Sequence, residues 1–480
     1  QSFYHFRWNC ASQTDETNCA GNLQTIRGNL TLVSTGSTGK LKLAESADYT
    51  LTITGNWDHQ GGTLNMGGGT SNAIINLYGN FSLSGGKITE LNSTDYYTQI
   101  NFVKAGEQTF TKSGGVFENN IDFGISSGTT LNTGTSVVDG SAGQFSVNSG
   151  STLRTSHPDG IANSGAAGSI QTASRYYSFA ANYHYDRNGA QSTGNGLPSP
   201  LNGKLLIGSG SSATNLTITN SSVTINGTLL LCSSNLANST IASGTVTYGS
   251  AGTLEYQGLT QQTVTLMEWP VTSPPVNVRQ DNGYGLAMNG NRTVAGTLTL
   301  SQGTFSVGHN TLTLNGTLTR VAGVLAGSTL SNVNVGGSSP TPLELSAITL
   351  DTLVLNRASG LRLAGDLTIA GAMVMTLGNV STVTGSRMIY QASSRLIYNG
   401  SATQSTMVLE FPDANSPPSL EIDKPAGSTL ALTLSRLLQS GLYLKSGNFS
   451  LGSNSLTING QISRTSGILI GGAASSLTFA

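Results

Sequence analysis

Charged residues are scarce in this sequence. Only 9% of its 480 residues are Asp, Glu, Lys or Arg, against roughly 25% in typical soluble domains. The 22 basic and 23 acidic residues nearly cancel to a net charge of −1, and no basic block occurs. The chain therefore lacks the electrostatic footprint of a protein that binds nucleic acid or an anionic membrane surface.

Long apolar runs are absent as well. No segment reaches the roughly 18 to 20 apolar residues that cross a bilayer, so we expect no membrane insertion. The start has no basic segment followed by an apolar one, as a signal peptide would have. Because the chain begins at Gln1 rather than Met, we expect a mature product of signal-peptide cleavage or a truncated chain.

Cysteine occurs three times. Cys10 and Cys19 bracket the short polar loop "ASQTDETN", which a disulfide could close in an oxidising compartment. We predict a Cys10–Cys19 disulfide, with two unpaired thiols as the alternative. Cys232 lies where related copies of a repeat have Ser301 and Lys445, which predicts a surface or partly buried position.

Glycine, by contrast, is abundant, with 61 residues, and the apolar residues come in short alternating bursts. A disordered chain would have fewer apolar residues and more charge. Alternation such as Leu298, Leu300, then Phe305, Val307, has a period of two over four to six residues. This pattern predicts short strands with one buried face, and no helical period is convincing.

An internal repeat follows the same pattern. The stretch "LTLNGTLTR" (312–320) returns as "LTINGQISR" (456–464), and the two are the second and fourth copies of a unit of about 72 residues. Three copies carry a hairpin-like phrase with Tyr, Gly, Gln and Pro in order, beginning at Tyr185, Tyr256 and Tyr398. The copy near Pro340 lacks the tyrosine and the glutamine.

Tandem β-sandwiches or one continuous solenoid could produce such repeats. No Pro-rich or charged linker interrupts the bursts, so we predict an all-β parallel β-helix (β-solenoid) of about 20 coils, each of roughly 20 to 26 residues. Coils stacked about 4.8 Å apart place like residues above like, with apolar ladders inside and Ser, Thr and Asn ladders at the corners. The result would be a rod on the order of 100 Å long.

Three regions are expected along the chain. Residues 1–28 are aromatic, charged and cysteine-bearing, and we predict an N-terminal cap over an open sheet edge. Residues 29–140 are predicted to form irregular solenoid coils, and residues 141–480 the four degenerate repeats. The pattern stops in mid-course at Ala480, where we expect a continuation of the chain or a contact with another subunit.

Motifs that carry chemistry are weak. "GISSG" (124–128) matches a nucleophile elbow, but another strand pattern follows it instead of a helix. The five histidines lack zinc-binding spacings, and we expect each on a solvated surface. Acidic residues are scattered, with small groupings around Asp95 and Asp159. We predict no enzyme, no catalytic residue, no metal site and no cofactor.

Aromatic residues have two interpretations. Tyr176, Tyr177, Tyr183 and Tyr185, in "YYSFAANYHY", could form a sugar-stacking platform or a stabilising aromatic ladder, and we favour the ladder. Trp269 is replaced by Phe411 in the matching copy, and interchangeable bulk indicates packing rather than recognition.

The phrases "YDRNGAQSTGNGLP", "LEYQGLTQQTV" and "GTLTLSQGTFSVGHNTLTLNG" resemble repeats of large secreted adhesin-like β-solenoid proteins of Bacteroidetes and related bacteria, many exported by the type IX route. The resemblance covers roughly residues 140–480 and lacks the C-terminal sorting domain usual in that group. It implies an extracellular or cell-surface location and a structural or adhesive role.

Two functional hypotheses result. The first is an extracellular structural or adhesive rod, a subunit of an end-to-end filament that self-associates through residues 1–28 and the C-terminus. The second is a carbohydrate-binding or polysaccharide-degrading β-helix whose partners are surface glycans.

Overall fold

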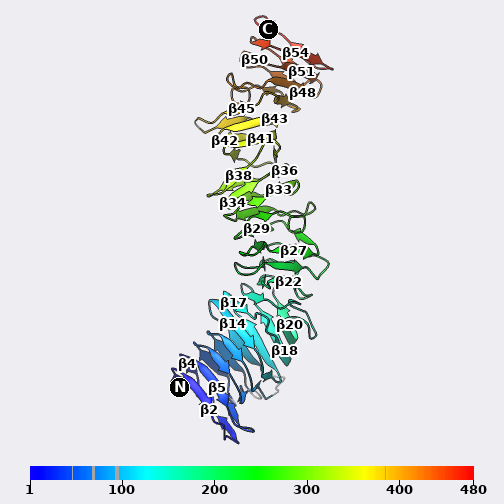
Figure 1. The fold of residues 1–480 in the computed structure, drawn as a ribbon. Helices are drawn as coiled ribbons and strands as arrows, with labels where there is room; N and C mark the ends of the chain where they lie inside the picture. Colours follow the sequence, from blue (N-terminus) through cyan, green and yellow to red (C-terminus); the bar gives the residue numbers. More distant parts are fainter. Residues whose placement is uncertain (46, 68–70, 92–96, 384) are drawn as a thin grey trace. The chain divides into compact units, whose positions relative to one another are not determined.

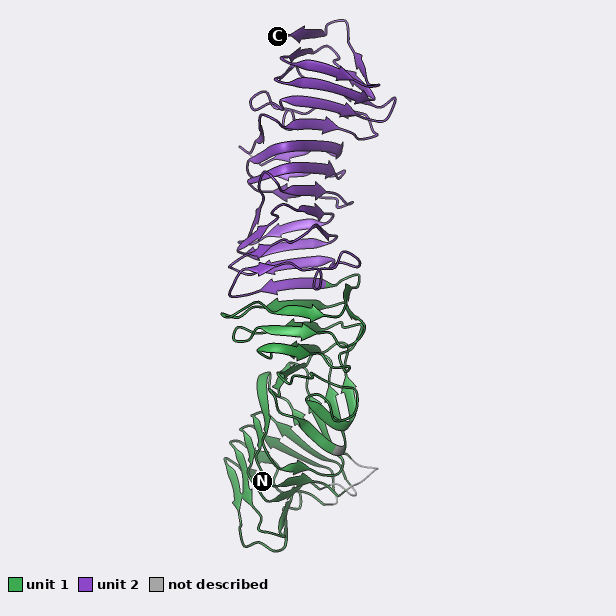
Figure 2. Ribbon diagram, turned by 45° about the vertical axis from the view of Figure 1, so that its right-hand side comes forward, with its two compact units in different colours: residues 1–252 green, residues 253–480 purple. Residues whose placement is uncertain are grey.

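The computed structural model describes residues 1–45, 47–67, 71–91, 97–383 and 385–480. Within these residues there is no helix, and short parallel strands form a β-solenoid of about 20 turns (Figure 1). The predicted fold class is therefore confirmed. Two compact units divide the chain, unit 1 at Gln1–Gly252 and unit 2 at Thr253–Ala480 (Figure 2), so the division falls inside the predicted repeat region.

In unit 1 each early coil has three strands, one in each of three parallel ladders. The first ladder is β1 (Ser2–Phe3), β4 (Thr25–Ile26), β7 (Tyr49–Ile53), β10 (Ala73–Leu77), β13 (Thr98–Phe102), β16 (Ile121–Ile125), β18 (Val138–Val147) and β20 (Ile170–Tyr177). The second is β2 (Phe6–Asn9), β5 (Leu30–Ser34), β8 (Trp57–His59), β11 (Phe81–Leu83), β14 (Gly106–Lys112), β17 (Thr129–Asn132), β19 (Thr152–Thr155), β21 (Asn182–Tyr185), β23 (Lys204–Ile207) and β26 (Thr228–Cys232). The third is β3 (Glu16–Asn18), β6 (Lys40–Lys42), β9 (Thr63–Asn65), β12 (Lys87–Thr89) and β15 (Val116–Phe117). Later coils add β22 (Gly189–Ser192), β24 (Thr214–Thr217) and β27 (Thr240–Ser243), and the pair β25 (Val223–Ile225) and β28 (Val246–Tyr248).

Unit 2 has the same parallel construction. Its ladders are β29 (Thr253–Gln257), β31 (Asn277–Asp281), β34 (Thr297–Gln302) and β37 (Thr317–Arg320), and β30 (Gln262–Thr263), β32 (Leu286–Ala287), β35 (Thr304–Ser306) and β38 (Val324–Ala326). The longest is β33 (Arg292–Val294), β36 (Thr311–Leu314), β39 (Asn332–Val335), β41 (Ile348–Asn356), β43 (Leu367–Leu377), β46 (Arg395–Tyr398), β48 (Ser419–Asp423), β51 (Gly441–Ser446) and β54 (Gln461–Arg464), with β45 (Met388–Tyr390) beside β43. Shorter ladders are β40 (Leu343–Leu345), β42 (Leu361–Leu363) and β44 (Val380–Thr382), then β47 (Gln404–Ser405), β49 (Thr429–Ala431), β52 (Asn448–Ser450) and β55 (Ile468–Ile470), and finally β50 (Arg436–Leu438), β53 (Ser455–Ile458) and β56 (Ser476–Phe479).

The predicted coil length of roughly 20 to 26 residues holds for some coils, but others in unit 1 are longer. Asn182 Nδ2, for example, donates to Thr152 Oγ1 of the neighbouring coil across 30 residues. In unit 1 the Asn72 amide nitrogen donates to Asp48 Oδ1 of the preceding coil, 24 residues earlier. The Tyr97 amide nitrogen donates in turn to Asn72 Oδ1, across a separation of 25 residues. In unit 2 the hydroxyls of Thr297 and Thr317, paired neighbours in adjacent coils, are hydrogen-bonded across 20 residues. The repeated nonapeptides fold alike, as β36–β37 and as β53–β54.

The hairpin-like phrases do not form hairpins. Tyr185 ends β21 and Gln191 lies in β22, but β21 pairs with β23, whereas β22 pairs with β24. Each phrase is instead a corner between two strands of one coil, because its two strands belong to different parallel ladders.

Like residues stack along the solenoid as predicted. In the core, the Trp57, Phe81 and Phe110 rings follow one another at centroid distances of 5.1 Å. At a corner, the Asn56 amide nitrogen donates to Asn29 Oδ1 at 3.0 Å, and the Asn80 amide nitrogen donates to Asn56 Oδ1 at 2.9 Å. Each asparagine side chain thus accepts a backbone N–H from the following coil.

Residues 1–28 form strands β1 to β4, and Ser2 already lies beside Thr25 in the first ladder. These residues therefore wind as part of the solenoid, and their role as a cap stays a prediction. Trp269 and Phe411 are fully buried, which confirms their packing role. The expectation that every histidine is solvated is wrong for His59, which is fully buried because its position on β8 points inward between Leu32 and Leu83.

Candidate functional site

The predicted tyrosine platform is not formed by the four residues named. Tyr183 and Tyr185 are each 1% exposed, because they occupy the inward positions of β21. Tyr183 Oη donates to Ser178 O at 2.8 Å, and Tyr185 Oη donates to Thr193 O at 3.0 Å. Burial raises the pKa of both phenols. These two tyrosines therefore belong to the core, and their burial excludes them from a surface platform.

The other two tyrosines lie on β20. Tyr177 is partly buried, donates its hydroxyl to Ala162 O at 3.1 Å and packs edge-on against Tyr183 at 6.4 Å. Tyr176 is 51% exposed. Of the four predicted residues, Tyr176 alone presents most of its ring to solvent.

The predicted Cys10–Cys19 disulfide is not formed in the structure, where both cysteines are free. Cys10 follows β2 and its amide binds Ser34 O, whereas Cys19 follows β3 and its amide binds Lys42 O. The loop between them turns the corner from the second ladder to the third. Cys232 is partly exposed, in agreement with the prediction.

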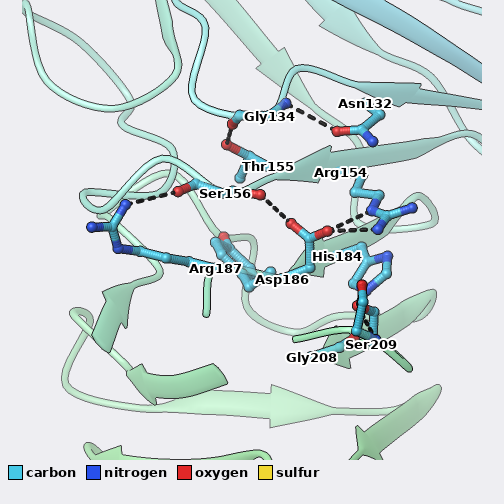
Figure 3. Close-up of polar contacts among 12 residues, drawn as sticks. Asn132, Gly134, Arg154, Thr155, Ser156, His184, Asp186, Arg187, Gly208 and Ser209 are labelled. Atoms are coloured by element: carbon cyan, nitrogen blue, oxygen red, sulfur yellow. Dashed lines mark hydrogen bonds and ion pairs between the residues drawn. The ribbon is translucent and has the colours of Figure 1, made fainter. Parts of the chain in front are cut away.

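A cluster of polar side chains surrounds Arg154 on β19 (Figure 3). Arg154 Nε and Nη2 contact Asp186 Oδ2 at 2.7 and 2.6 Å, and Arg154 Nη1 contacts Glu107 Oε2 at 2.8 Å. Ser156 Oγ donates to Asp186 Oδ1 at 2.6 Å. The Asp186 side chain is only 7% exposed, whereas that of Glu107 is 45% exposed.

Strand register brings these residues together. Asn132, Arg154 and His184 are stacked at one outward position of β17, β19 and β21. Glu107 comes from β14, so the side chain of Arg154 joins coils on both sides of its own. Burial lowers the pKa of Arg154, but the carboxylates of Asp186 and Glu107 together hold it above its usual value.

Two histidines lie near this cluster. His184 Nε2 is 2.7 Å from Gly208 O. Both residues are labelled in Figure 3. Burial lowers the pKa of His184, with the Gly208 hydrogen bond opposing this shift. Burial also lowers the pKa of His157, whose Nδ1 accepts the Asp159 N–H at 3.2 Å. Both rings are therefore predominantly neutral at pH 7.

The same arrangement, one charge between two opposite charges, recurs elsewhere. Within the described ranges there are five such clusters, which we call charge triads: Glu16–Lys42–Glu45, Glu107–Arg154–Asp186, Glu255–Arg279–Asp281, Arg320–Glu344–Arg362 and Arg395–Glu421–Lys445. Glu421 is the most buried of the central charges, with a side chain 4% exposed. Each triad connects strands of different coils.

The chemistry open to these triads is limited. General acid and base catalysis on a glycan requires two carboxyl groups that face one shared space. In the Arg154 cluster a guanidinium lies between the carboxylates and hydrogen-bonds to both. Among the described residues no group of three or more His, Cys, Asp or Glu could hold a metal ion. The grouping around Asp95 lies outside the described residues.

A second set of polar residues escaped sequence reasoning. Among the described residues, four buried side chains with N–H donors each bind two carbonyl oxygens that are two residues apart in an earlier coil, and we call them carbonyl clamps. They are Gln108 (Leu77 and Gly79), Gln191 (Thr155 and His157), Arg357 (Leu314 and Gly316) and Lys424 (Gly400 and Ala402). The repeated glutamine could have indicated these contacts, because Gln191 is the glutamine of the phrase that begins at Tyr185.

The tyrosine of the repeated phrase is also structural. Tyr256 Oη donates to Glu268 Oε1 at 3.1 Å, and Tyr398 Oη donates to Glu410 Oε1 at 3.0 Å. Both glutamates precede the interchangeable Trp269 and Phe411. Burial raises the pKa of Glu410. The Tyr…Glu-Trp/Phe-Pro pattern therefore encodes a buried corner.

The fold and these clusters define a β-solenoid repeat protein whose polar side chains tie neighbouring coils together. Comparison of the chain with protein-family models, curated proteins and solved structures found no match. In the described parts of the chain, no helix meets the length and hydropathy of a membrane span.

Proposed function

We propose that this protein is a non-enzymatic, extracellular β-solenoid with a structural or adhesive role. The main observation behind the proposal is that buried polar side chains form hydrogen bonds from one coil to another. Lys424, for example, is fully buried, and its Nζ binds Gly400 O, Ala402 O and Gln404 Oε1 at 2.6 to 2.9 Å. Such contacts stabilise successive coils and support no reaction.

The extracellular location rests on the resemblance of the repeats and on the low content of charge. Self-association is part of the same proposal. Within the described residues β1, β2 and β3 each pair with one neighbouring strand only, and an unpaired strand edge is a template for another chain. A second copy of this chain is the partner that we propose for this edge.

Two measurements test the proposal. Incubation with a panel of polysaccharides should release no reducing ends or unsaturated sugars, and release from any polymer overturns the non-enzymatic function. Sedimentation should detect oligomers that Tyr4→Lys weakens, since Tyr4 is 71% exposed beside β1. Tyr284→Lys, on an exposed tyrosine of unit 2, is the matched control. A monomer at all concentrations rejects self-association.

A further inference from the structure

The outward face of the first ladder in unit 1 carries two columns of side chains that are mostly polar and uncharged. Strand pairing aligns Thr52, Asn76, Asn101, Gly124, Ser146 and Tyr176 in one column. The neighbouring column contains Thr50, Ile74, Gln99, Asp122, Gln144 and Ser174. Asp122 is the only charged residue in either column. We call these twelve residues the amide face.

Gly124 keeps the centre of the amide face flat. A Cβ atom there would lie 2.7 Å from Asn101 Oδ1 and 3.1 Å from Gln99 Nε2. The amides of the preceding coil therefore lie over the glycine backbone, in space that any other residue would fill. Since the φ of Gly124 is not in the left-handed region, alanine fits the backbone there, but its methyl group would displace the ends of the Asn101 and Gln99 side chains.

The polar groups of this face retain hydrogen-bonding capacity. Asn101 Nδ2 donates to Asn76 Oδ1 at 3.2 Å, and Gln144 Nε2 donates to Ser174 Oγ at 3.2 Å. The side-chain amide of Gln99 has no hydrogen-bond partner among the described residues. Burial raises the pKa of Asp122, with the Gln144 N–H opposing the shift. The face thus offers amide donors and acceptors with little charge.

Two exposed tyrosines lie on or beside the amide face. Tyr176 lies on β20 and is 51% exposed, and Tyr78 directly follows β10 and is 42% exposed. Leu77 points inward, so alternation places Tyr78 on the outer side. Four strand steps separate β10 from β20, which corresponds to about 19 Å at about 4.8 Å per step.

We propose that the amide face binds a neutral polysaccharide chain. Aromatic rings contact the apolar faces of sugar rings, while amides exchange hydrogen bonds with sugar hydroxyls. The near absence of charge favours an uncharged glycan over an anionic one. An anionic glycan would be repelled by Asp122, and neither column contains a basic residue that could bind it. This inference rests on the adhesive form of the proposed function and names its ligand class.

Calorimetric titration of the full chain with neutral hexasaccharides (cellohexaose, chitohexaose, maltohexaose and xylohexaose) tests the proposal. At least one should bind, and Tyr176→Ala should weaken its binding about tenfold, since about 1.4 kcal/mol of ring contact corresponds to that factor. Gly124→Ala should weaken binding similarly, because the new methyl group displaces the Asn101 and Gln99 amides. Tyr176→Phe should retain binding, and Tyr284→Ala in unit 2 is the matched control.

Three results overturn the inference. They are binding of none of the four sugars, binding of hexagalacturonate in preference to all of them, and binding that Tyr176→Ala and Gly124→Ala leave unchanged in variants with unaltered circular dichroism. The outcome is distinguishable from that of the proposed function. Cleavage of a polymer rejects the non-enzymatic function and leaves the binding face in place, whereas absent binding without cleavage rejects this inference alone.

Discussion

Arg154 Nε donates to Asp186 Oδ2 at 2.7 Å across the step from β19 to β21. The two residues are 32 positions apart in the sequence, and Asp186 is 6% exposed. A carboxylate with so little access to water depends on its partner, because an unpaired buried charge is costly. Glu107, on the other side of Arg154, is far more exposed and depends on it less.

Arg154→Leu should therefore lower the free energy of unfolding by about 3 kcal/mol, mainly by leaving Asp186 unpaired. Glu107→Gln should cost at most about 1 kcal/mol, as for an exposed ion pair. Urea denaturation of both variants measures the difference. Arg387→Leu is the control, because the side chains of Arg387 and of its partner Asp366 are 66% and 36% exposed. Equal losses at Arg154 and Arg387 would contradict the role of burial.

Lys424→Met should destabilise unit 2 by about 3 kcal/mol or more, because the carbonyl oxygens of Gly400 and Ala402 lose a charged donor in a buried place. Methionine retains the length of the side chain, so cavity formation contributes little. Hydrogen exchange should accelerate locally around residues 400–404. The exposed Lys204→Met provides the control, and unchanged exchange at 400–404 would reject the carbonyl clamp.

Much of the fold could be predicted because its determinants are local. The alternation of Leu298 and Leu300 specifies a strand with one buried face, and the Asn-Gly corner of 312–320 recurs at 456–464. Stacking then follows from the repeat, since short strands without linkers bury their faces against adjacent coils. The structure confirms the ladders from these two signals.

The site could not be predicted to the same depth because its contacts depend on register. Glu107 and Arg154 are 47 residues apart, and no local pattern relates them. The prediction of a tyrosine platform was wrong for a related reason. In "NYHY" the period of two does not say which side faces inward, and Tyr183 and Tyr185 point to the core while His184 points out. The pairing of Tyr183 with Leu205 and of Tyr185 with Ile207 on β23 shows which side of the strand faces the core.

Close approach of the coils gives a third prediction. A Cβ at Gly316 would lie 1.8 Å from Gly296 O, a backbone atom that cannot move aside without separating the coils. Gly316→Ala should therefore lower the free energy of unfolding by about 1–3 kcal/mol or more. Gly283→Ala is the matched control, because its nearest neighbour would be the flexible Gln302 side chain at 3.6 Å. Similar stability of the two variants would show that the coils have room at Gly316.

His59 gives a prediction for pH dependence. Burial lowers its pKa to about 4, against 6.5 for a solvated histidine, so the folded chain binds this proton more weakly than the unfolded chain. The unfolded state then carries more bound protons between about pH 6.5 and pH 4. Stability that is fully present above pH 6.5 should be lost as the pH falls through this window, by about 3 kcal/mol in total.

His59→Leu should remove this part of the pH dependence. The inward neighbours of His59 in the ladder are Leu32 and Leu83, so leucine continues an existing apolar column. His59 Nδ1 has no hydrogen-bond partner, and His59 Nε2 lies 3.4 Å from Gly62 O. Gly62 O also accepts the Lys87 N–H at 2.8 Å, so this carbonyl keeps a partner when His59 is replaced. Urea denaturation from pH 7 to pH 4 should give a flatter stability profile for His59→Leu than for the parent chain. The exposed His309→Leu should keep the parent slope, and a parental slope in His59→Leu would place the acid sensitivity elsewhere.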